Sequence, residues 1–559
     1  MLIWFDENPD RYWWLVCCTI AATLFLLLRP LLRPAWQDRQ RTDWGWSLAI
    51  LVVLMAGRWP TWYITRQFNP DESQLIAGAI TLRHDPVFWR SVDGATAGPL
   101  DFFALLPAGW IHGADDYFSA RLTALGLIAV ALIFAHQTIA LAFGRLVARV
   151  TGFGTLCFES LTLHNDLLHY STELVPVSLL AVAFFLAVQR FVVKADWRWN
   201  GMGGLLLGAI PLTKLQAMPL AVFLGLGWII GEWWLLKEHA AERRRRLVAL
   251  CAGASVPLIV CALLLTATGQ WRNAMISYFL HNLTYVDSAD LPLKGVLAMT
   301  WRIAIREDPV FVSWILGGGL WLLLLSPLLR TPARPARLVA AAATAFFLVS
   351  LICIAVPRRP FLHYGQFLVV PWTLVLGSIT GLVMERLGSR RAPLRCGVLC
   401  AAVLCTTGGL LYLRASLPPP WAGRLTQYQT HPQGAVAKEL RKYAQAGEAL
   451  GIWGCMSNYY VEANLRQATR EAHSQLEIID SPHYDYFRQR YLADFRRSAA
   501  PVFVDAVGPG NSLFQNRALA HEVIFPELAA YVQDHYTPVA AVHGSRIYVR
   551  KDRLIAAQP

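Results

Sequence analysis

The chain has 559 residues, of which 55% are hydrophobic and only 16% are charged. Soluble domains carry about 25% charged residues, so the composition excludes an ordinary soluble protein. The formal net charge of +13 does not indicate nucleic-acid binding, because the basic residues gather in short loops between apolar runs, as the positive-inside rule describes.

Apolar runs of roughly 20 residues recur along most of the chain, which is typical of membrane-spanning helices. Basic residues follow alternate runs, for example Arg29 and Arg33 after the first run and Arg390 and Arg391 near the end. The loops that contain them should be cytoplasmic. The sequence therefore predicts a polytopic α-helical membrane protein. About 12 spans are expected, at 12–32, 44–65, 119–143, 149–168, 174–193, 200–216, 217–236, 247–268, 308–328, 338–356, 363–384 and 395–413.

The domain organisation follows from where the apolar runs stop. Residues 1–413 should form the membrane domain, and its first outer loop, 66–118, contains a Gly- and Pro-broken apolar segment expected to form interfacial helices. A Pro-rich linker is expected at 414–423. Residues 424–559 are polar enough to form a small mixed α/β domain outside the membrane.

Short patterns predict the elements of this outer domain. ALGIWG, APVFVDAV and SRIYVRK are expected to be buried strands, and PQGAVAKELRKYAQA, YDYFRQRYLADFRRS and FPELAAYVQDHY amphipathic helices. Arg466 and Arg470, in ANLRQATR, are expected on a solvated face.

The first outer loop contains the motif NPDE, in which Asn69 and Pro70 precede Asp71 and Glu72. The motif is typical of a helix start, because Asn caps helices, Pro fits the first position and acids favour the first turn. The two carboxylates are also candidates for acid–base chemistry, since they stand at the membrane boundary within reach of water. Both interpretations remain open at this point.

Other ionisable residues are expected on the same outer face, at the ends of different spans. Lys214 ends one span, and a lysine at a membrane boundary is a functional candidate. His164 and His169 are more typical of interfacial hydrogen bonding than of metal ligation, and Glu159, inside a span, is expected to pair with a neighbouring helix. The remaining candidates are Asp166, Glu173, Arg358, Arg359, His363 and Tyr364.

Cations and acids on one face suit group transfer from a phosphate leaving group. Lys and Arg would neutralise the charge that develops on the phosphate, and a carboxylate would accept the proton of an attacking hydroxyl. Carboxylates could also hold a divalent metal that helps the phosphate to leave. A lipid phosphate would reach such a site sideways from the bilayer.

These motifs resemble those of a known family. NPDE followed by GATAGPL resembles the GT-C superfamily of polyprenyl-phosphate-sugar-dependent glycosyltransferases, in particular the bacterial protein mannosyltransferases and lipid A aminoarabinose and galacturonic acid transferases. HYSTELVP is similar to the second acidic element, PLTK to the Leu-Thr-Lys element, and RPFLHYGQFLVVP to the Arg/Lys-x-x-x-Tyr-x-x-x-x-x-Pro element. The order agrees across roughly residues 44–385. Two features depart from the family: an extra N-terminal span, and histidines around the second acid.

The resemblance implies an inverting transferase that moves a sugar from a polyprenyl-phosphate carrier to a cell-envelope acceptor, which would be lipid A, another glycan or a protein. Asp71 would be the general base, and Glu72 would assist it or a metal. Glu173 would be the second acid, with Asp166 as the alternative. The expected phosphate contacts are Lys214, Tyr364, Arg359 and His363.

The expectations for cofactor, location and rival functions rest on the residues as well as on the resemblance. A divalent ion, Mg²⁺ or Mn²⁺, is an open possibility, with Asp71, Glu72 and His164 as candidate ligands. The chain would be a multi-pass protein of the bacterial inner membrane, with its active site and C-terminal domain in the periplasm. The rival function is a transporter or flippase of lipid-linked sugars, which would place ionisable groups near the bilayer midplane. A non-catalytic scaffold is a third alternative.

Overall fold

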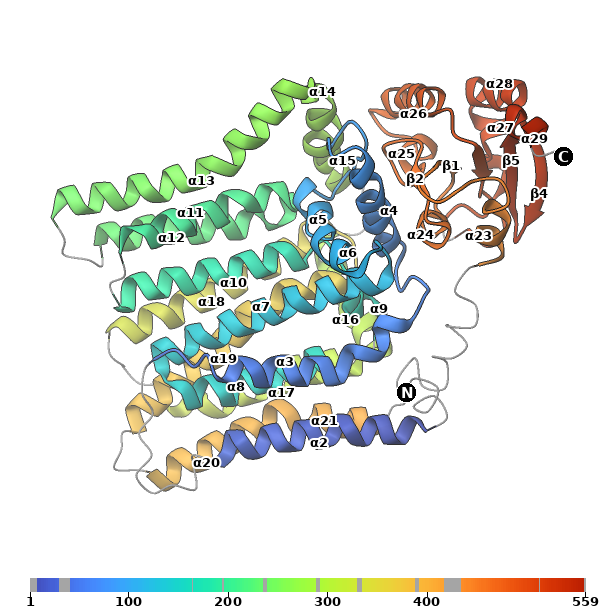
Figure 1. The fold of residues 1–559 in the computed structure, drawn as a ribbon. Helices are drawn as coiled ribbons and strands as arrows, with labels where there is room; N and C mark the ends of the chain where they lie inside the picture. The colour runs from blue at the N-terminus through green and yellow to red at the C-terminus, as the bar shows by residue number, and fades with distance from the viewer. Residues whose placement is uncertain are drawn as a thin grey trace.

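The computed structural model describes residues 8–29, 41–162, 164–193, 196–234, 239–287, 292–328, 334–387, 392–416, 434–511 and 513–556. Long helices lie roughly side by side, and a smaller α/β domain sits at one end of the bundle (Figure 1). The predicted polytopic helical fold with a C-terminal α/β domain is confirmed.

Among the described residues, nine helices are long and apolar enough to cross a membrane. They are α2 (Pro9–Leu28), α7 (Tyr117–Phe143), α10 (Leu174–Val188) with η3 (Gln189–Val193), η5 (Leu215–Ala217) with α12 (Met218–Trp234), α13 (Ala240–Thr268), α17 (Pro309–Leu325) with η7 (Ser326–Leu328), α18 (Arg334–Ala355), η8 (Leu362–Gly365) with α19 (Gln366–Leu387), and α20 (Ala392–Val403) with η10 (Leu404–Gly408) and α21 (Gly409–Ser416).

Three shorter helices coincide with the other predicted spans. α3 (Trp46–Arg58) and α11 (Trp197–Ala209) have 13 residues each, and α8 (Arg145–Leu161) has 17. α3 and α11 continue as the 3-10 turns η2 (Trp59–Tyr63) and η4 (Ile210–Leu212). The number of 12 spans therefore stays a prediction.

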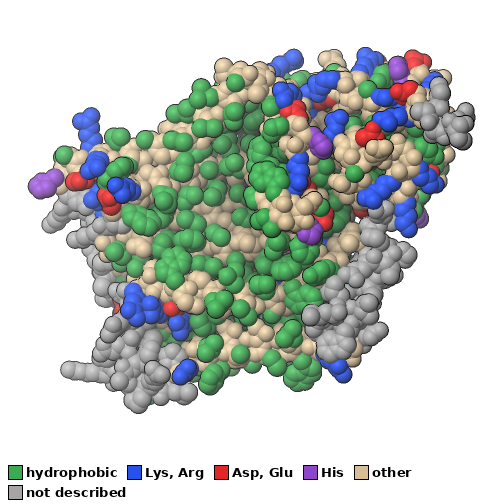
Figure 2. Space-filling view, viewed as in Figure 1, with side chains coloured by type: hydrophobic (Ala, Val, Ile, Leu, Met, Phe, Trp, Pro, Cys, Tyr) green, Lys and Arg blue, Asp and Glu red, His purple; other side chains and the backbone are tan. Residues whose placement is uncertain are grey.

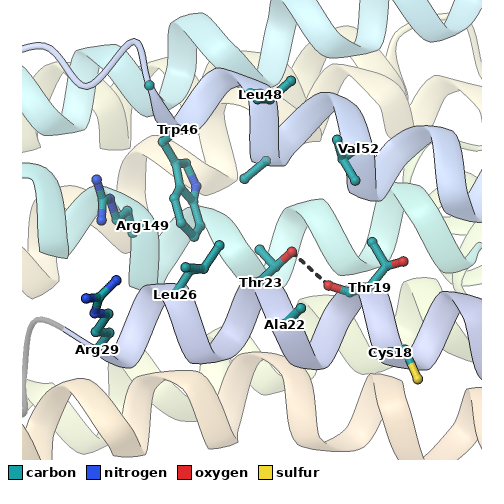
Figure 3. A pocket seen from close by; sticks show the side chains of 12 residues that line it. Cys18, Thr19, Ala22, Thr23, Leu26, Arg29, Trp46, Leu48, Val52 and Arg149 are labelled. Carbon is teal, nitrogen blue, oxygen red and sulfur yellow. Dashed lines mark hydrogen bonds between the residues drawn. The ribbon is translucent and has the colours of Figure 1, made fainter.

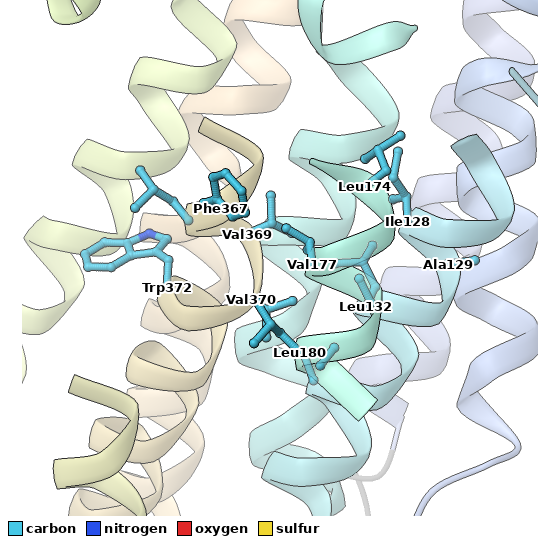
Figure 4. Packing of buried hydrophobic residues seen from close by; sticks show 14 of the residues in the cluster. Ile128, Ala129, Leu132, Leu174, Val177, Leu180, Phe367, Val369, Val370 and Trp372 are labelled. Carbon is cyan, nitrogen blue, oxygen red and sulfur yellow. The ribbon is translucent and has the colours of Figure 1, made fainter. Parts of the chain in front are cut away.

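The core of the bundle lies around α19. In this span 94% of the apolar stretch is buried within the protein, against 6% in α13, which lies at the edge. Figure 4 shows Val369 and Val370 of α19 packed near Val177 and Leu180 of α10. A helix that is apolar on all sides belongs in such a core.

Two buried ionisable side chains inside the bundle form an ion pair. Glu159 of α8 accepts a bond from Arg58 of α3 at 2.6 Å, and both side chains are buried. The expected pairing of Glu159 with a neighbouring helix is confirmed. On the face shown in Figure 2, hydrophobic side chains cover the middle of the molecule, and charged side chains gather toward its two ends.

Short helices cover the end of the bundle that faces the C-terminal domain (Figure 1). α13 ends at Thr268, where Gly269 caps it in the left-handed conformation, and the described part of the segment up to Glu307 consists largely of short helices. In the first outer loop the expected helices are present. The elements at this end are α4 (Pro70–His84), α5 (Pro99–Phe103), α6 (Leu106–His112), α9 (Asn165–Leu168), α14 (Trp271–Asn273), η6 (Ala274–Leu280), α15 (His281–Asp287) and α16 (Leu293–Glu307).

The C-terminal domain contains a mixed five-stranded sheet in the order β2-β1-β3-β5-β4. β1 pairs in parallel with β2 and β3, whereas β5 pairs antiparallel with β3 and β4. The three predicted strands are confirmed as β1, β3 and β5. β2 is too short and β4 too poor in large apolar residues to have been expected. The strands are β1 (Ala449–Trp453), β2 (Arg466–Gln467), β3 (Val502–Asp505), β4 (Tyr536–Val542) and β5 (Ser545–Arg550).

The three predicted helices of this domain are also confirmed, as α23, α26 and α28. The helical elements are α23 (Ala435–Leu440), α24 (Asn458–Ala463), α25 (Gln475–Ile478), α26 (Tyr484–Ser498), η11 (Arg517–Leu519), α27 (His521–Ile524), α28 (Pro526–His535) and α29 (Lys551–Ala556).

Some predictions fall on parts of the chain outside the described residues. The predicted linker, 414–423, is described only to Ser416, where α21 ends. The basic positions Arg33, Arg390 and Arg391 also lie outside the described residues.

Candidate active site

Asp71 lies in the first turn of α4. Asn69 caps the helix, because its Oδ1 accepts a hydrogen bond from the Asp71 backbone N–H at 2.9 Å, and Pro70 occupies the first helical position. The helix-start interpretation of NPDE is therefore confirmed. The cap uses only the Asp71 backbone, and its exposed carboxylate lines a cavity.

Glu72 does not line this cavity. Its side chain is fully buried, and its two oxygens accept hydrogen bonds from Arg121 of α7, each at 2.8 Å. Arg121 also donates to backbone carbonyls in the loop before α4, at Thr61, Ile64 and Arg66. Glu72 therefore fixes the start of α4 to α7, and this position does not support its predicted part in the reaction or in metal binding.

Removal of this carboxylate should affect stability. We expect Glu72→Ala to destabilise the fold by about 3–5 kcal/mol, because Arg121 would be left buried and uncompensated. The measurement is the fraction of protein that stays monodisperse in detergent after heating, compared with Asp71→Asn. An unchanged melting temperature for Glu72→Ala would contradict the structural role.

Asp166 of α9 and His363 of η8 connect the turn before α10 to the start of the α19 span. Asp166 Oδ1 accepts a hydrogen bond from the Asn69 side-chain amide at 2.8 Å, and His363 Nδ1 lies 3.4 Å from Asp166 Oδ2. Asn69 thus makes two contacts: its Oδ1 caps α4, and its Nδ2 donates to Asp166. Because Asp166 also contacts His363, these bonds hold the first turn of α4, which contains Asp71, against the start of the α19 span.

Glu173 and Lys214 form a second, deeper pair. Lys214 Nζ donates to Glu173 Oε1 and, at 2.8 Å, to Thr172 Oγ1. His363 Nε2 lies 4.0 Å from Glu173 Oε1, so the imidazole stands between Asp166 and Glu173. An ammonium group has three N–H donors, and two of those on Lys214 are used by these contacts.

The two acids of this network are held in their charged forms. Burial alone would raise the pKa of Asp166, but the hydrogen bond and charge of His363 lower it below its ordinary value. Burial likewise opposes ionisation of Glu173, but the charges of Lys214 and His363 lower its pKa to about 2. Desolvation raises the pKa of Asp101, buried in α5 nearby, well above its ordinary value. Asp166 and Glu173 are therefore held as carboxylates, whereas burial favours the neutral form of Asp101.

A cavity of about 290 Å³ unites most of the predicted residues. The charged groups of the cavity act on the hydroxyl of Tyr285, in α15. Burial raises the pKa of this hydroxyl; the positive charges of Arg359 and Lys214 lower it, and the negative charge of Asp71 raises it. Lys214 Nζ lies 4.9 Å from the centre of the Tyr364 ring. The predicted residues that line the cavity are Asp71, Lys214, Arg359, His363 and Tyr364.

The C-terminal domain forms another wall of the same cavity. The segment 473–482 contributes His473, Gln475, Asp480 and Ser481. Burial lowers the pKa of His473, although the Asp71 carboxylate opposes this change. The cavity is thus built jointly by the membrane domain and the outer domain.

A buried ion pair and a buried hydrogen bond anchor the outer domain to the first outer loop. Arg470 is 7% exposed, pairs with Asp494 at 2.7 Å, and donates to the backbone carbonyl of Trp89 at 2.6 Å. Arg490 pairs with Asp93 of the loop at 2.9 Å. The prediction that Arg470 lies on a solvated face is wrong. Arg470 is buried against segments far away in the sequence, which the local pattern does not show.

The candidate metal ligands are not brought together. Glu72 pairs with Arg121, and His164 Nε2 lies 2.7 Å from Glu307 of α16. Within the described ranges, no three His, Cys, Asp or Glu side chains are placed to hold one metal ion. The predicted set of Asp71, Glu72 and His164 therefore does not fit a divalent cation.

The chain was compared with known proteins and structures. No protein-family model and no curated protein matches it. ArnT from Cupriavidus metallidurans bound to undecaprenyl phosphate is a structural match with a TM-score of 0.57 and 14% identity, covering 90% of this chain and 98% of that one. The apo state of ArnT matches with a TM-score of 0.50 and 13% identity, over 90% and 97%. The chain has the GT-C fold. At this identity the similarity establishes the fold alone.

The GT-C fold predicted from the order of short motifs is thus confirmed over most of the chain. Sequence reasoning missed the cavity residues from α15 and from the C-terminal domain, because no motif marks them. One signal was present for Arg121: an arginine inside the predicted span 119–143 requires a partner. That partner is Glu72.

Proposed function

We propose that the chain is a membrane glycosyltransferase that transfers a sugar from a polyprenyl-phosphate carrier to a cell-envelope acceptor. The acceptor would be lipid A, another glycan or a protein. The observation that carries the proposal is one cavity lined by an exposed carboxylate, Asp71, together with the cations Lys214 and Arg359 and the hydroxyl of Tyr364. The GT-C fold agrees with this chemistry, and ArnT with that fold has been solved with undecaprenyl phosphate bound.

The proposed reaction is a single displacement. The acceptor hydroxyl oxygen attacks the anomeric carbon of the sugar, and the bond from that carbon to the phosphate oxygen breaks with its electron pair leaving on the phosphate. Asp71 accepts the hydroxyl proton. Attack from the face opposite the leaving group inverts the anomeric configuration.

The cations would act on the leaving group. Lys214 uses two donors on Glu173 and Thr172, which leaves one N–H for a phosphate oxygen. Arg359 lines the same cavity and supplies a second positive charge. Charge-assisted hydrogen bonds to a phosphate that gains charge stabilise the transition state more than the ground state.

The predicted second acids would position these groups. Glu173 orients Lys214, and Asp166 links His363 to the Asn69 cap of the α4 turn. We assign Glu72 a structural role through Arg121, and the proposed reaction has no metal step because the candidate ligands do not converge.

A transporter of lipid-linked sugars remains the functional rival. Transporters place their ionisable groups near the midplane on broken helices. Here the cavity lies at the end of the bundle, closed by the C-terminal domain, which supports an enzyme that works at the membrane surface.

We place the protein in a bacterial inner membrane, with the cavity and C-terminal domain on the periplasmic side. The charge distribution of the loops supports this orientation. A reporter fused after Leu413 is expected to be active in the periplasm. Activity of the same reporter in the cytoplasm would contradict the orientation.

The experiment that tests the proposal compares envelope glycans by mass spectrometry in cells with and without the gene. We expect one acceptor class to lose a mass equal to one glycosyl group when the gene is absent, and to regain it on complementation. Identical envelope masses in both strains would contradict the proposal. The mass that is lost would also identify the sugar and the class of acceptor.

A further inference from the structure

A second cavity lies far from the candidate active site, between α2 and α3. It is an open groove of about 800 Å³ in the membrane part of the protein. Its walls are apolar, with Leu26 of α2 and Leu48 and Val52 of α3 all exposed in the groove. Figure 3 shows Leu26 and Val52 between the two helices. The size is within the range of small-molecule sites.

Among the described residues that line the groove, the two cations stand at one end. Arg29, exposed at the C-terminal end of α2, and Arg149 of α8 both line it and lie at the same end in Figure 3. Arg149 also pairs with Asp43 at 2.7 Å, and Arg145 lies 3.8 Å from the same carboxylate. Two arginines therefore share one aspartate, and together with Arg29 they give this end of the groove a net positive charge.

The groove is as deep as one leaflet of a bilayer. It extends along α2 from Cys18 to Arg29, and a helix rises 1.5 Å per residue, so this stretch covers about 16 Å. That length is about half of the 30 Å hydrocarbon core of a bilayer. The apolar walls thus match the depth of acyl chains, and the arginines stand at the level of the headgroups.

The hydroxyl groups of the groove need no ligand. Thr23 donates to the backbone carbonyl of Thr19 at 2.8 Å, and Thr19 donates to that of Leu15 at 2.8 Å. An occupant therefore needs only apolar surface along the groove and negative charge at its end.

α2 is only partly packed against the rest of the protein. At the N-terminal end of the helix, Tyr12 donates to the backbone carbonyls of Ala56 and Gly57 of α3, at 2.8 and 2.9 Å. Only 28% of the apolar stretch of α2 is buried within the protein. An occupant of the groove would complete the packing of α2 where side chains do not.

We propose that this groove binds one anionic phospholipid of the leaflet opposite the C-terminal domain. Its acyl chains would lie between α2 and α3, and its phosphate would contact Arg29 and Arg149. Basic pockets between transmembrane helices are recognised sites for anionic headgroups. The inference does not depend on the reaction proposed above, because the two sites share no residue.

The test is native mass spectrometry of the purified full chain after equilibration with phosphatidylglycerol or with phosphatidylcholine of the same acyl chains. We expect preferential retention of phosphatidylglycerol. Arg29→Gln should lower that retention about fivefold, the effect of one basic residue near a headgroup, and leave phosphatidylcholine unchanged. Ala22→Phe, which fills the groove, should lower retention of both lipids.

The matched control is Arg198→Gln, since Arg198 is a highly exposed arginine at the start of α11. It should bind phosphatidylglycerol as the wild type does. Equal retention of both lipids by the wild type, or an Arg29→Gln variant that binds phosphatidylglycerol normally, would overturn the proposal. Glycerol 3-phosphate, which carries the headgroup charge without acyl chains, should not displace the lipid; displacement would point to a soluble phosphate site instead.

Discussion

Asp71→Asn is expected to lower the rate of sugar transfer by about 10²- to 10⁴-fold, the usual contribution of a general base. The amide cannot accept the proton of the acceptor hydroxyl, yet it has the shape of the carboxylate. The cap of α4 uses the Asp71 backbone N–H, so the variant should fold and insert normally. The measurement is the mass-spectrometric yield of modified acceptor in complemented cells, normalised to the amount of protein in the membrane.

The matched control for this variant is Asp85→Asn, at the other end of α4. Asp85 pairs with Arg90 at the surface and does not line the cavity. Asp85→Asn should therefore retain wild-type transfer. Full activity of Asp71→Asn would eliminate Asp71 as the base, whatever the control does.

The second large effect is expected at Lys214. Lys214→Met alone would leave Glu173 buried without its cation, which costs about 3–5 kcal/mol and risks misfolding. We therefore expect the informative variant to be Lys214→Met combined with Glu173→Gln, which removes both charges. It should fold like the wild type and transfer sugar about 10²- to 10³-fold more slowly, as when one oxyanion donor is removed.

The sign of the pH effect follows from the lowered pKa of Glu173. A carboxyl group whose pKa is lowered by folding adds stability above its unfolded pKa of about 4.3. That stability is lost as the pH falls toward about 2 in the wild type. The double variant should lack this loss of stability, which is measured as melting temperature against pH.

The control for the transfer rate is Lys294→Met, at an exposed lysine of α16. Normal transfer by the double variant would contradict the phosphate role of Lys214.

Much of the candidate site could be predicted because it depends on which face of the membrane each helix end reaches. Asp71, Lys214 and Tyr364 each stand at a helix end, and the alternation of basic loops places those ends on one face. Hydrophobic periodicity fixes where spans begin and end, so the convergence of these residues follows without any knowledge of tertiary contacts. Their roles in the reaction stay predictions.

The remaining features depend on long-range contacts that no local pattern encodes. Glu72 and Asp71 are adjacent acids of one motif, so the sequence does not distinguish their roles. The pairing of Glu72 with Arg121 depends on how α7 packs. The sequence alone does not decide between Asp166 and Glu173, and the structure places His363 between them. Arg470 is buried because the outer domain rests on the first outer loop.

The central claim is that a glycosyl group leaves a polyprenyl-phosphate carrier and joins an acceptor. The most direct test is to incubate membranes that contain the protein with the total lipid-linked sugars of the cell. The masses of carrier and acceptor are then measured by mass spectrometry. We predict that free polyprenyl phosphate forms and that the acceptor gains the mass lost by the carrier, with neither change in Asp71→Asn. Movement of an intact carrier across the bilayer, with no change in either mass, would contradict the account and favour a transporter.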